Sequence, residues 1–260
     1  MVPQLSLAGR IAVVTGASRK IGIGAAICRA LAEAGADVFF TYWTGYDKTM
    51  PWGVDEDEPA RLQEEIRSCG VRCERVEVDL SDPQALPLLL DSVEERLGAP
   101  AILVNNACYS VNDGYEQLTA ELLDAHYAVN VRATALLSAE FARRFGLGQG
   151  GRIINLATGQ AQAPMIGEIA YASTKAAVET FTRILAAEVA NKGITVNAVN
   201  PGPTDTGWMN DELTEHLLPH FPMGRVGQPQ DAARLVRFLA SDEAEWVTGQ
   251  IIHSEGGFLR

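Results

Sequence analysis

Residues 11–34 read IAVVTGASRKIGIGAAICRALAEA, and this stretch decides the fold. An apolar run of strand length ends at Thr15, a glycine-rich loop follows, and a segment with helical periodicity comes next. Gly16 permits a tight turn, Gly22 lets the backbone approach a pyrophosphate, and Gly24 allows the helix to pack closely. Because a helix N-terminus offers free N–H groups and positive potential, the segment predicts a dinucleotide phosphate site.

Apolar runs of strand length alternate with helical patterns along the rest of the chain. The expected strands are Ile11 to Thr15, Val38 to Thr41, Cys73 to Val78, Ile102 to Val104, Arg152 to Leu156, Thr195 to Val199 and Gln250 to His253. The expected helices are Gly24 to Ala34, Pro59 to Cys69, Leu86 to Leu97, Ala120 to Phe145, Ala170 to Asn191 and Pro229 to Ala240. This alternation is typical of an α/β protein with a doubly wound parallel sheet and helices on both faces. The irregular excursion from Trp43 to Glu58 favours a solvated loop, with a functional insert as the alternative.

Composition narrows the class of protein. With 260 residues, 47% of them apolar and 21% charged, we expect one globular domain over residues 1–260. The net charge of −12 disfavours nucleic acid as a partner. No apolar run approaches the roughly 20 residues that span a bilayer, and the N-terminus lacks a signal-peptide pattern, so we expect a cytoplasmic protein without a membrane partner. The four cysteines form no C-x-x-C pair, which predicts reduced thiols and no metal site.

The pentapeptide Tyr171-Ala172-Ser173-Thr174-Lys175 places a phenol and an ammonium four residues apart on one helix face. A free tyrosine ionises near pH 10, about three units too high for proton transfer at neutral pH, so roughly 4 kcal/mol of phenolate stabilisation is needed. We expect the Lys175 cation to supply it. The pair therefore predicts an acid–base catalyst.

Together these motifs resemble the short-chain dehydrogenase/reductase family over nearly the whole chain, including its 3-oxoacyl-acyl-carrier-protein reductases. The resemblance implies a single-domain Rossmann fold with a seven-stranded sheet. Family members usually show T-G-x-x-x-G-x-G, so this chain carries a two-residue insertion within Ala17 to Ile21. Enoyl-carrier-protein reductases have a similarly lengthened loop but a different Tyr-to-Lys spacing.

Further segments match the family's cofactor contacts. Asp79-Leu80 resembles the adenine contact, Asn105-Asn106-Ala107 resembles N-N-A-G with Cys108 where glycine is usual, and Pro201-Gly202-Pro203-Thr204 resembles the segment beside the nicotinamide amide. The implied cofactor-binding residues are Gly16, Ser18, Arg19, Lys20, Gly22, Ile23, Gly24, Tyr42, Asp79, Leu80, Asn106, Ala107, Tyr171, Lys175, Pro201, Gly202 and Thr204.

The end of the second strand bears on cofactor choice. An NAD enzyme commonly has an acidic residue there for the ribose hydroxyls, whereas this chain has Tyr42. Arg19 and Lys20 add positive charge where a 2′-phosphate would lie. We favour NADP; NAD remains open, with Lys20 as a solvated insertion residue.

The resemblance implies a catalytic set of Asn130, Thr158, Tyr171 and Lys175, with threonine where serine is usual. Tyr171 would transfer the proton and Lys175 would hold the nicotinamide ribose. Thr158 would orient the carbonyl and stabilise developing negative charge. Asn130 would anchor a relay water through its backbone carbonyl in a kinked helix. The implied reaction is hydride transfer between nicotinamide and a ketone or secondary alcohol.

Substrate and assembly are less constrained. Candidate pocket segments are Tyr109 to Asn112, Gln160 to Met165, and a lid at about 204–228 that includes Trp208, Met209 and Phe221. The alternatives are a 3-oxoacyl reductase, a dehydrogenase of sugars, polyols or small alcohols, and a non-catalytic dinucleotide sensor. The net charge opposes an acidic carrier, although Arg132, Arg143 and Arg144 offer a local basic patch.

The family's usual assembly implies a homotetramer packed through the two long helices. Two apolar stripes on these helices suit that packing, one of Leu122, Ala125 and Val129 and the other of Val178, Phe181 and Leu185.

Overall fold

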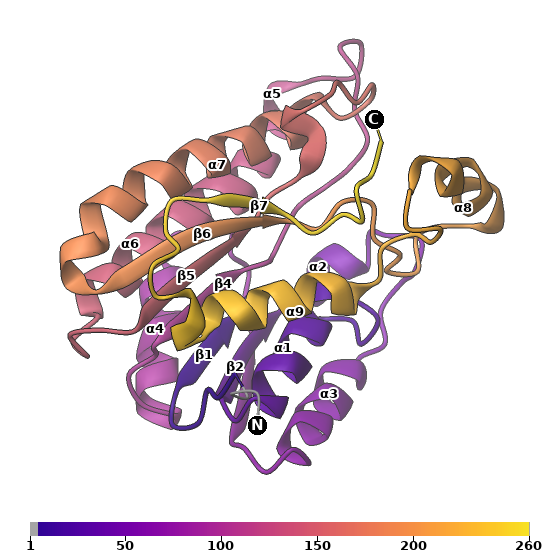
Figure 1. Cartoon of the computed structure of the whole chain (residues 1–260). Helices are drawn as coiled ribbons and strands as arrows, with labels where there is room; N and C mark the ends of the chain where they lie inside the picture. The colour runs from indigo at the N-terminus through magenta and orange to yellow at the C-terminus, as the bar shows by residue number, and fades with distance from the viewer. Residues whose placement is uncertain (1–4, 260) are drawn as a thin grey trace.

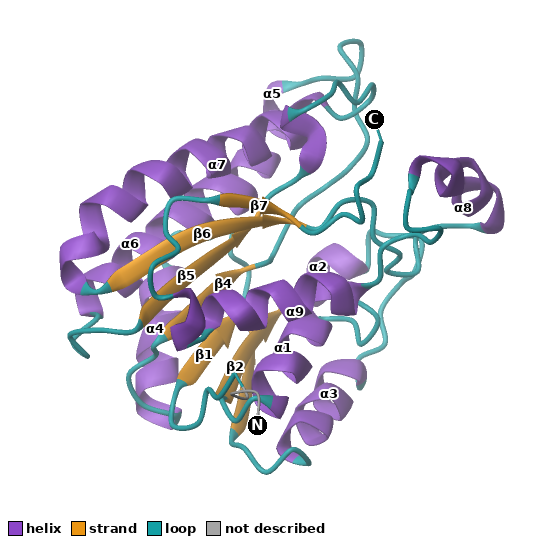
Figure 2. Cartoon of the chain, viewed as in Figure 1, coloured by secondary structure: helices purple, strands orange, loops and turns teal. Residues whose placement is uncertain are grey.

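The computed structural model describes residues 5–259. Seven parallel strands form one sheet in the order β3-β2-β1-β4-β5-β6-β7 (Figure 2). The strands are β1 (Ile11–Val14), β2 (Asp37–Tyr42), β3 (Cys73–Glu77), β4 (Ile102–Asn105), β5 (Gly151–Leu156), β6 (Ile194–Asn200) and β7 (Ile251–His253). The chain winds outward in both directions from the β1–β4 pair, so the predicted doubly wound sheet is confirmed.

Helices cover both faces of the sheet (Figure 1). They are α1 (Ile23–Glu33), α2 (Thr44–Asp47), α3 (Glu58–Arg67), α4 (Ala85–Arg96), α5 (Ala120–His126), α6 (Thr134–Arg144), α7 (Ile169–Val189), α8 (Asp211–Leu217) and α9 (Pro229–Ala240). Successive strand residues face opposite sides, so Val14 joins the core under α1, α3 and α9, while Val13 joins the core under α4, α6 and α7. Both cores are apolar, which explains the near-continuous apolar runs of the central strands.

The predicted helix Ala120 to Phe145 is interrupted. A π-helical segment, Tyr127–Ala133, separates α5 from α6. A π-helical bond pattern changes which carbonyl each N–H reaches, and such segments are frequent at functional sites. Asn130 lies in the middle of this segment and is 1% exposed.

The excursion from Trp43 to Glu58 is more ordered than the favoured solvated loop. It contains the short helix α2, and its Asp47 is 6% exposed. The Asp47 carboxylate accepts a hydrogen bond of 3.1 Å from the indole N–H of Trp52. The expectation of a solvated loop is therefore wrong for the part around α2, because Asp47 is buried and the Tyr46 ring packs on Tyr109, whereas Trp43 and Trp52 are exposed.

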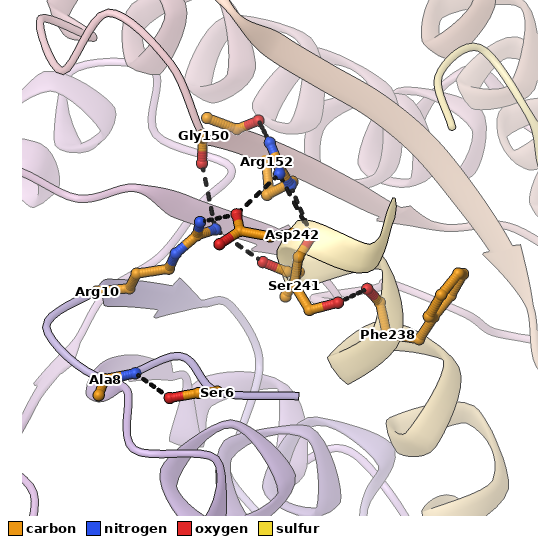
Figure 3. Close-up of polar contacts among 10 residues, drawn as sticks. Ser6, Ala8, Arg10, Gly150, Arg152, Phe238, Ser241 and Asp242 are labelled. Atoms are coloured by element: carbon orange, nitrogen blue, oxygen red, sulfur yellow. Dashed lines mark hydrogen bonds and ion pairs between the residues drawn. The ribbon is translucent and has the colours of Figure 1, made fainter. Parts of the chain in front are cut away.

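Two arginines tie the elements together where β1 and β5 begin (Figure 3). Arg10, which precedes β1, donates to the Ala240 carbonyl at the end of α9 (3.0 Å) and pairs with Asp242. The buried Arg152 on β5 donates to the Ser241 carbonyl at 3.3 Å. These contacts hold the amino ends of the strands and leave the carboxyl ends to form a site.

None of the helices within residues 5–259 is both long enough and apolar enough to cross a membrane.

Candidate active site

A cavity of about 1170 Å³ lies at the carboxyl ends of the strands on the β1 and β4 side. This is where open α/β sheets bind ligands. The predicted cofactor residues that line it are Gly16, Ser18, Arg19, Gly22, Ile23, Gly24, Tyr42, Asp79, Leu80, Asn106 and Ala107. The other predicted cofactor residues, Lys20, Tyr171, Lys175, Pro201, Gly202 and Thr204, do not line it, although Thr206 does.

The glycine loop packs its backbone tightly against neighbouring segments, and the absence of side chains at these positions leaves room for a phosphate. A Cβ on Gly24 would lie 2.5 Å from the Gly16 carbonyl oxygen and 2.6 Å from Asn106 Nδ2. Gly16 itself has φ of +74°, which favours glycine. The helix α1 begins at Ile23, and its N-cap Gly22 has no side chain to occupy the first N–H groups. These free donors fit a dinucleotide pyrophosphate.

Asn106 holds this loop in place. Its side-chain amide donates to the carbonyl oxygens of Thr15 (2.9 Å) and Gly16 (2.8 Å). In return, the Thr15 hydroxyl accepts from the backbone N–H groups of Asn106 and Ala107, at 3.0 and 3.1 Å. The N-N-A segment thus fixes the shape of the cradle.

The two basic loop residues lie in different places. Arg19 lines the cavity, its guanidinium sits 4.3 Å over the Trp52 ring, and it donates to the Thr206 carbonyl. Lys20 instead forms an ion pair of 3.0 Å with Glu65. Of the two, Arg19 is therefore the one placed to meet a cofactor phosphate.

The catalytic candidates that follow β5 and lie on α7 come together around Tyr171. Thr158, two residues after β5, is close enough to the Tyr171 phenol to lower its pKa. Lys175 is 4% exposed, and its ammonium donates to the Leu156 carbonyl at 2.8 Å and lies 5.7 Å from the centre of the Tyr171 ring. Cys108 is their neighbour: burial raises the pKa of its thiol, and Lys175 and Tyr171 lower it.

The pKa of Tyr171 differs from expectation. Burial raises the pKa well above its usual value because it penalises the phenolate, and the nearby Cys108 and Glu168 raise it further. Among the main causes, only the neighbouring Thr158 lowers it. Lys175 is not among these main causes; its ammonium lies 5.7 Å from the ring centre and donates to the Leu156 carbonyl, so the lowering expected from Lys175 stays a prediction. Tyr171 is therefore protonated at neutral pH, as a general acid must be.

The side chain of Asn130 forms three hydrogen bonds that join two other segments of the chain. Its Oδ1 accepts from the Tyr109 N–H at 2.8 Å, and its Nδ2 donates to the Tyr109 carbonyl at 2.9 Å and to the Thr174 hydroxyl at 3.0 Å. Asn130 thus fastens the segment after β4 to the helix that carries Tyr171.

Several residues that line the cavity were absent from the sequence prediction. They are Trp43, Gly45, Tyr46, Asp47, Thr49 and Cys108, among others, whereas Tyr109 and Val111 belong to the predicted pocket segment Tyr109 to Asn112. The Tyr46 hydroxyl donates to the Ser110 carbonyl at 3.0 Å, and its ring lies 5.6 Å from the Tyr109 ring. The signal for these residues was the run of aromatic and glycine residues within an acidic excursion.

Two lid candidates are also placed. Phe221 is 4% exposed and packs on Phe258 with 4.8 Å between ring centres. Trp208 is half exposed, and its indole N–H donates to the Thr204 carbonyl at 2.9 Å. Helix α8, in the same segment, stands apart from the sheet layers (Figure 1).

Comparison with known proteins places this site in a family. A family model described as Enoyl-(Acyl carrier protein) reductase matches residues 16–259. The "Uncharacterized oxidoreductase YjdA" of Bacillus subtilis (strain 168) is 54% identical over 253 residues, covering 96% of this chain and 97% of that protein. The "NADPH-dependent aldehyde reductase-like protein, chloroplastic" of Arabidopsis thaliana is 40% identical, covering 99% and 97%. A short-chain dehydrogenase from Burkholderia cenocepacia J2315, solved with NADP, has a TM-score of 0.86 and 35% identity, covering 96% and 98%.

The chain belongs to the short-chain dehydrogenase/reductase family. It is an oxidoreductase that uses NAD(P) and acts on a carbonyl or CH–OH group. The predicted class of enzyme is confirmed, and a non-catalytic sensor is set aside.

Proposed function

We propose that this protein is an NADP-dependent reductase of ketones and related carbonyl compounds, which also oxidises the corresponding alcohols. The observation that carries the proposal is the cluster of Thr158, Tyr171, Cys108 and Lys175, in which the Lys175 ammonium lies 5.7 Å from the centre of the Tyr171 ring and Cys108 lines the glycine-cradled cavity. When bound, the nicotinamide ring supplies or accepts the hydride. The chain's own residues supply the proton and orient the reacting carbonyl.

Each catalytic residue has a proposed role in this reaction. Tyr171, held protonated by burial, gives its proton to the carbonyl oxygen in reduction. Thr158 donates a hydrogen bond to the same oxygen as negative charge develops. Lys175 holds the nicotinamide ribose, and the carbonyl of Asn130 anchors a relay water within the π-helical segment. All four belong to one domain, with residues at about 204–228 as its lid.

The proposed preference for NADP is supported by two similar proteins, one named as NADPH-dependent and the other solved with NADP, and by Arg19 at the cavity wall. We expect Arg19→Ala to weaken NADPH binding about 10- to 100-fold, the value of one charge-assisted hydrogen bond, and NADH binding much less. Lys20→Ala is the matched control, because Lys20 is paired with Glu65. Calorimetry with both cofactors measures this, and equal losses for NADPH and NADH in Arg19→Ala would show that Arg19 does not read the 2′-phosphate.

The activity is tested by a scan of NADPH and NADH oxidation against a panel of ketones, aldehydes and a 3-oxoacyl thioester. We expect turnover of small carbonyl compounds with NADPH. No turnover of any panel member with either cofactor would contradict the proposed function.

A 3-oxoacyl group on an acidic carrier protein is a weaker candidate. The basic patch expected for docking the carrier is neutralised: Arg143 and Arg144 both pair with Glu140, and Arg144 also pairs with Asp91 at 2.6 Å. Arg132 donates to the Ser81 carbonyl. With a net charge of −12, the chain has little to attract an acidic carrier.

We also propose that the protein lies in the cytoplasm, which the free thiols of Cys28, Cys69, Cys73 and Cys108 support.

For the assembly we propose a homotetramer. The stripe with Val178 and Leu185, which was expected at the interface between subunits, is instead buried in the subunit's own core. Leu136 on α6 and Ile184 on α7 are exposed instead. An interface between subunits that covers these two side chains would favour assembly. We expect light scattering at micromolar concentration to give four times the mass of the chain; a monomer would overturn the proposal.

A further inference from the structure

Buried polar atoms without partners gather at the start of α7. Within residues 5–259, the buried side-chain polar atoms that have no hydrogen-bond partner are Asp113 Oδ1, Gln160 Oε1, Glu168 Oε2 and Arg237 Nε. The first three, here called the acceptor cluster, belong to segments that flank Tyr171. Unpaired buried polar atoms are costly, so each one in a native protein calls for an explanation, such as a catalytic role or a bound partner that supplies the missing bond.

Asp113 is the most buried member of the cluster, at 3% exposed. Its N–H donates to the Gly167 carbonyl at 2.7 Å, and its Oδ2 accepts from the Ala170 N–H at 3.0 Å. These bonds fix Asp113 against the first turn of α7, directly before Tyr171. Its second oxygen, Oδ1, remains free to accept another hydrogen bond.

Glu168 is the N-cap residue of α7, but its side chain makes no capping bond. It lies one helical turn before Tyr171 and close enough that its charge raises the pKa of that phenol. Asp113 in turn raises the pKa of Glu168, in addition to the effect of burial, so the two carboxyl groups are neighbours. Neither carboxylate forms an ion pair in the described part of the chain.

Gln160 completes the cluster from the other side of the site. It lies two residues after Thr158, in the single 3-10 turn Gly159–Ala161, which contacts α7. Its amide nitrogen is directed to the Met165 sulfur, which leaves Oε1 without a donor. Acceptor atoms thus come from both segments that border the Thr158–Tyr171 pair.

We propose that the acceptor cluster is a subsite for hydroxyl groups on the substrate, so that the preferred substrates are hydroxylated carbonyl compounds and the matching polyols. The inference rests on the proposed reductase function. Hydroxyl groups donate to all three acceptors, whereas an alkyl group leaves them unpaired and a carboxylate or phosphate is repelled by Asp113 and Glu168. The subsite therefore selects substrates by donors placed next to the reacting carbonyl.

The test compares three ketones of nearly equal size: hydroxyacetone, butanone and aminoacetone. We expect the wild-type kcat/KM with NADPH to be at least about tenfold higher for hydroxyacetone than for butanone, the scale of one hydrogen bond to a charged acceptor. Glu168→Met should reduce that ratio about tenfold, and Glu168→Gln, which keeps an acceptor oxygen, should restore part of it. Because Glu168 also raises the pKa of Tyr171, the readout is the ratio and not the turnover of either ketone. Comparing ratios between variants cancels the intrinsic reactivity of each ketone. Gln160→Met provides a second, independent loss of an acceptor.

Binding of the product alcohols separates this proposal from the reductase proposal. Calorimetry with NADP⁺ present should show 1,2-propanediol binding more tightly than 2-butanol, and Glu168→Met should remove the difference. Lack of turnover with every ketone would contradict the reductase function, yet the alcohols still test the subsite. Equal binding of the two alcohols, a ratio unchanged in Glu168→Met, or a preference for aminoacetone would each overturn the hydroxyl subsite.

Discussion

We expect Tyr171→Phe to lower kcat about 10²- to 10⁴-fold, the range that general acid–base catalysis typically contributes. The substitution removes only the hydroxyl, so the ring that lies under the Lys175 ammonium is kept. Cofactor binding should change little, because the glycine loop and Asn106 that shape the cradle are untouched. Steady-state turnover and NADPH titration of the same preparation measure both effects.

A suitable control for this variant is Tyr46→Phe. Tyr46 is also a partly buried phenol of the cavity wall, but its hydroxyl donates to the Ser110 carbonyl. Its loss should therefore affect kcat far less than the loss of the Tyr171 hydroxyl. If Tyr171→Phe keeps more than about a tenth of kcat, Tyr171 is not the proton donor.

The parts of the fold that sequence predicts best are those set by local chemistry. The apolar run Ile11 to Thr15 with the glycines after it specifies a strand, a turn and a helix within 24 residues, residues 11–34, and the structure has all three. Gly16 and Gly24 are required by contacts with near neighbours, which a motif can encode. The seven strands follow from runs of apolar residues for the same reason.

The π-helical segment shows where local pattern fails. Residues 120–145 keep an ordinary helical periodicity, because one altered turn changes the hydrogen bonds without changing which side chains are apolar. The side chain of Asn130 bonds to Tyr109 and Thr174, which are 21 and 44 residues away. Patterns among residues that are close in the sequence cannot predict contacts over such separations.

The wall formed by Trp43 to Thr49 was missed for a related reason. The excursion is polar in composition, yet Tyr46 reaches the segment after β4 and contacts Tyr109. In the same way, the stripe with Val178 and Leu185 has the pattern of an interface but packs in the subunit's own core. An apolar stripe on a helix shows that this face is buried, but it does not show whether the same subunit or a second subunit covers it.

Thr158 is the position where the chain departs from its family's serine, and its substitution has the second largest expected effect. Thr158 is close enough to Tyr171 to lower its pKa, and its backbone is extended just after β5. We expect Thr158→Ala to lower kcat roughly 10²- to 10³-fold, the scale of removing one oxyanion donor. Thr158→Ser should keep kcat within about tenfold and widen the range of ketones accepted, since it keeps the donor and removes one methyl group.

Thr158→Val decides between hydrogen bonding and packing, because valine matches threonine in shape and lacks the hydroxyl. The hydroxyl has two possible effects on the acid: it lowers the pKa of Tyr171 against the effect of burial, and it binds the carbonyl oxygen. If the first effect matters, the pH at which reduction is lost through ionisation of Tyr171 should lie higher in Thr158→Val than in the wild type. If only the second matters, kcat falls with no change in the pH profile. A Val variant as active as the wild type would leave catalysis to Tyr171 and Lys175 without a third hydroxyl.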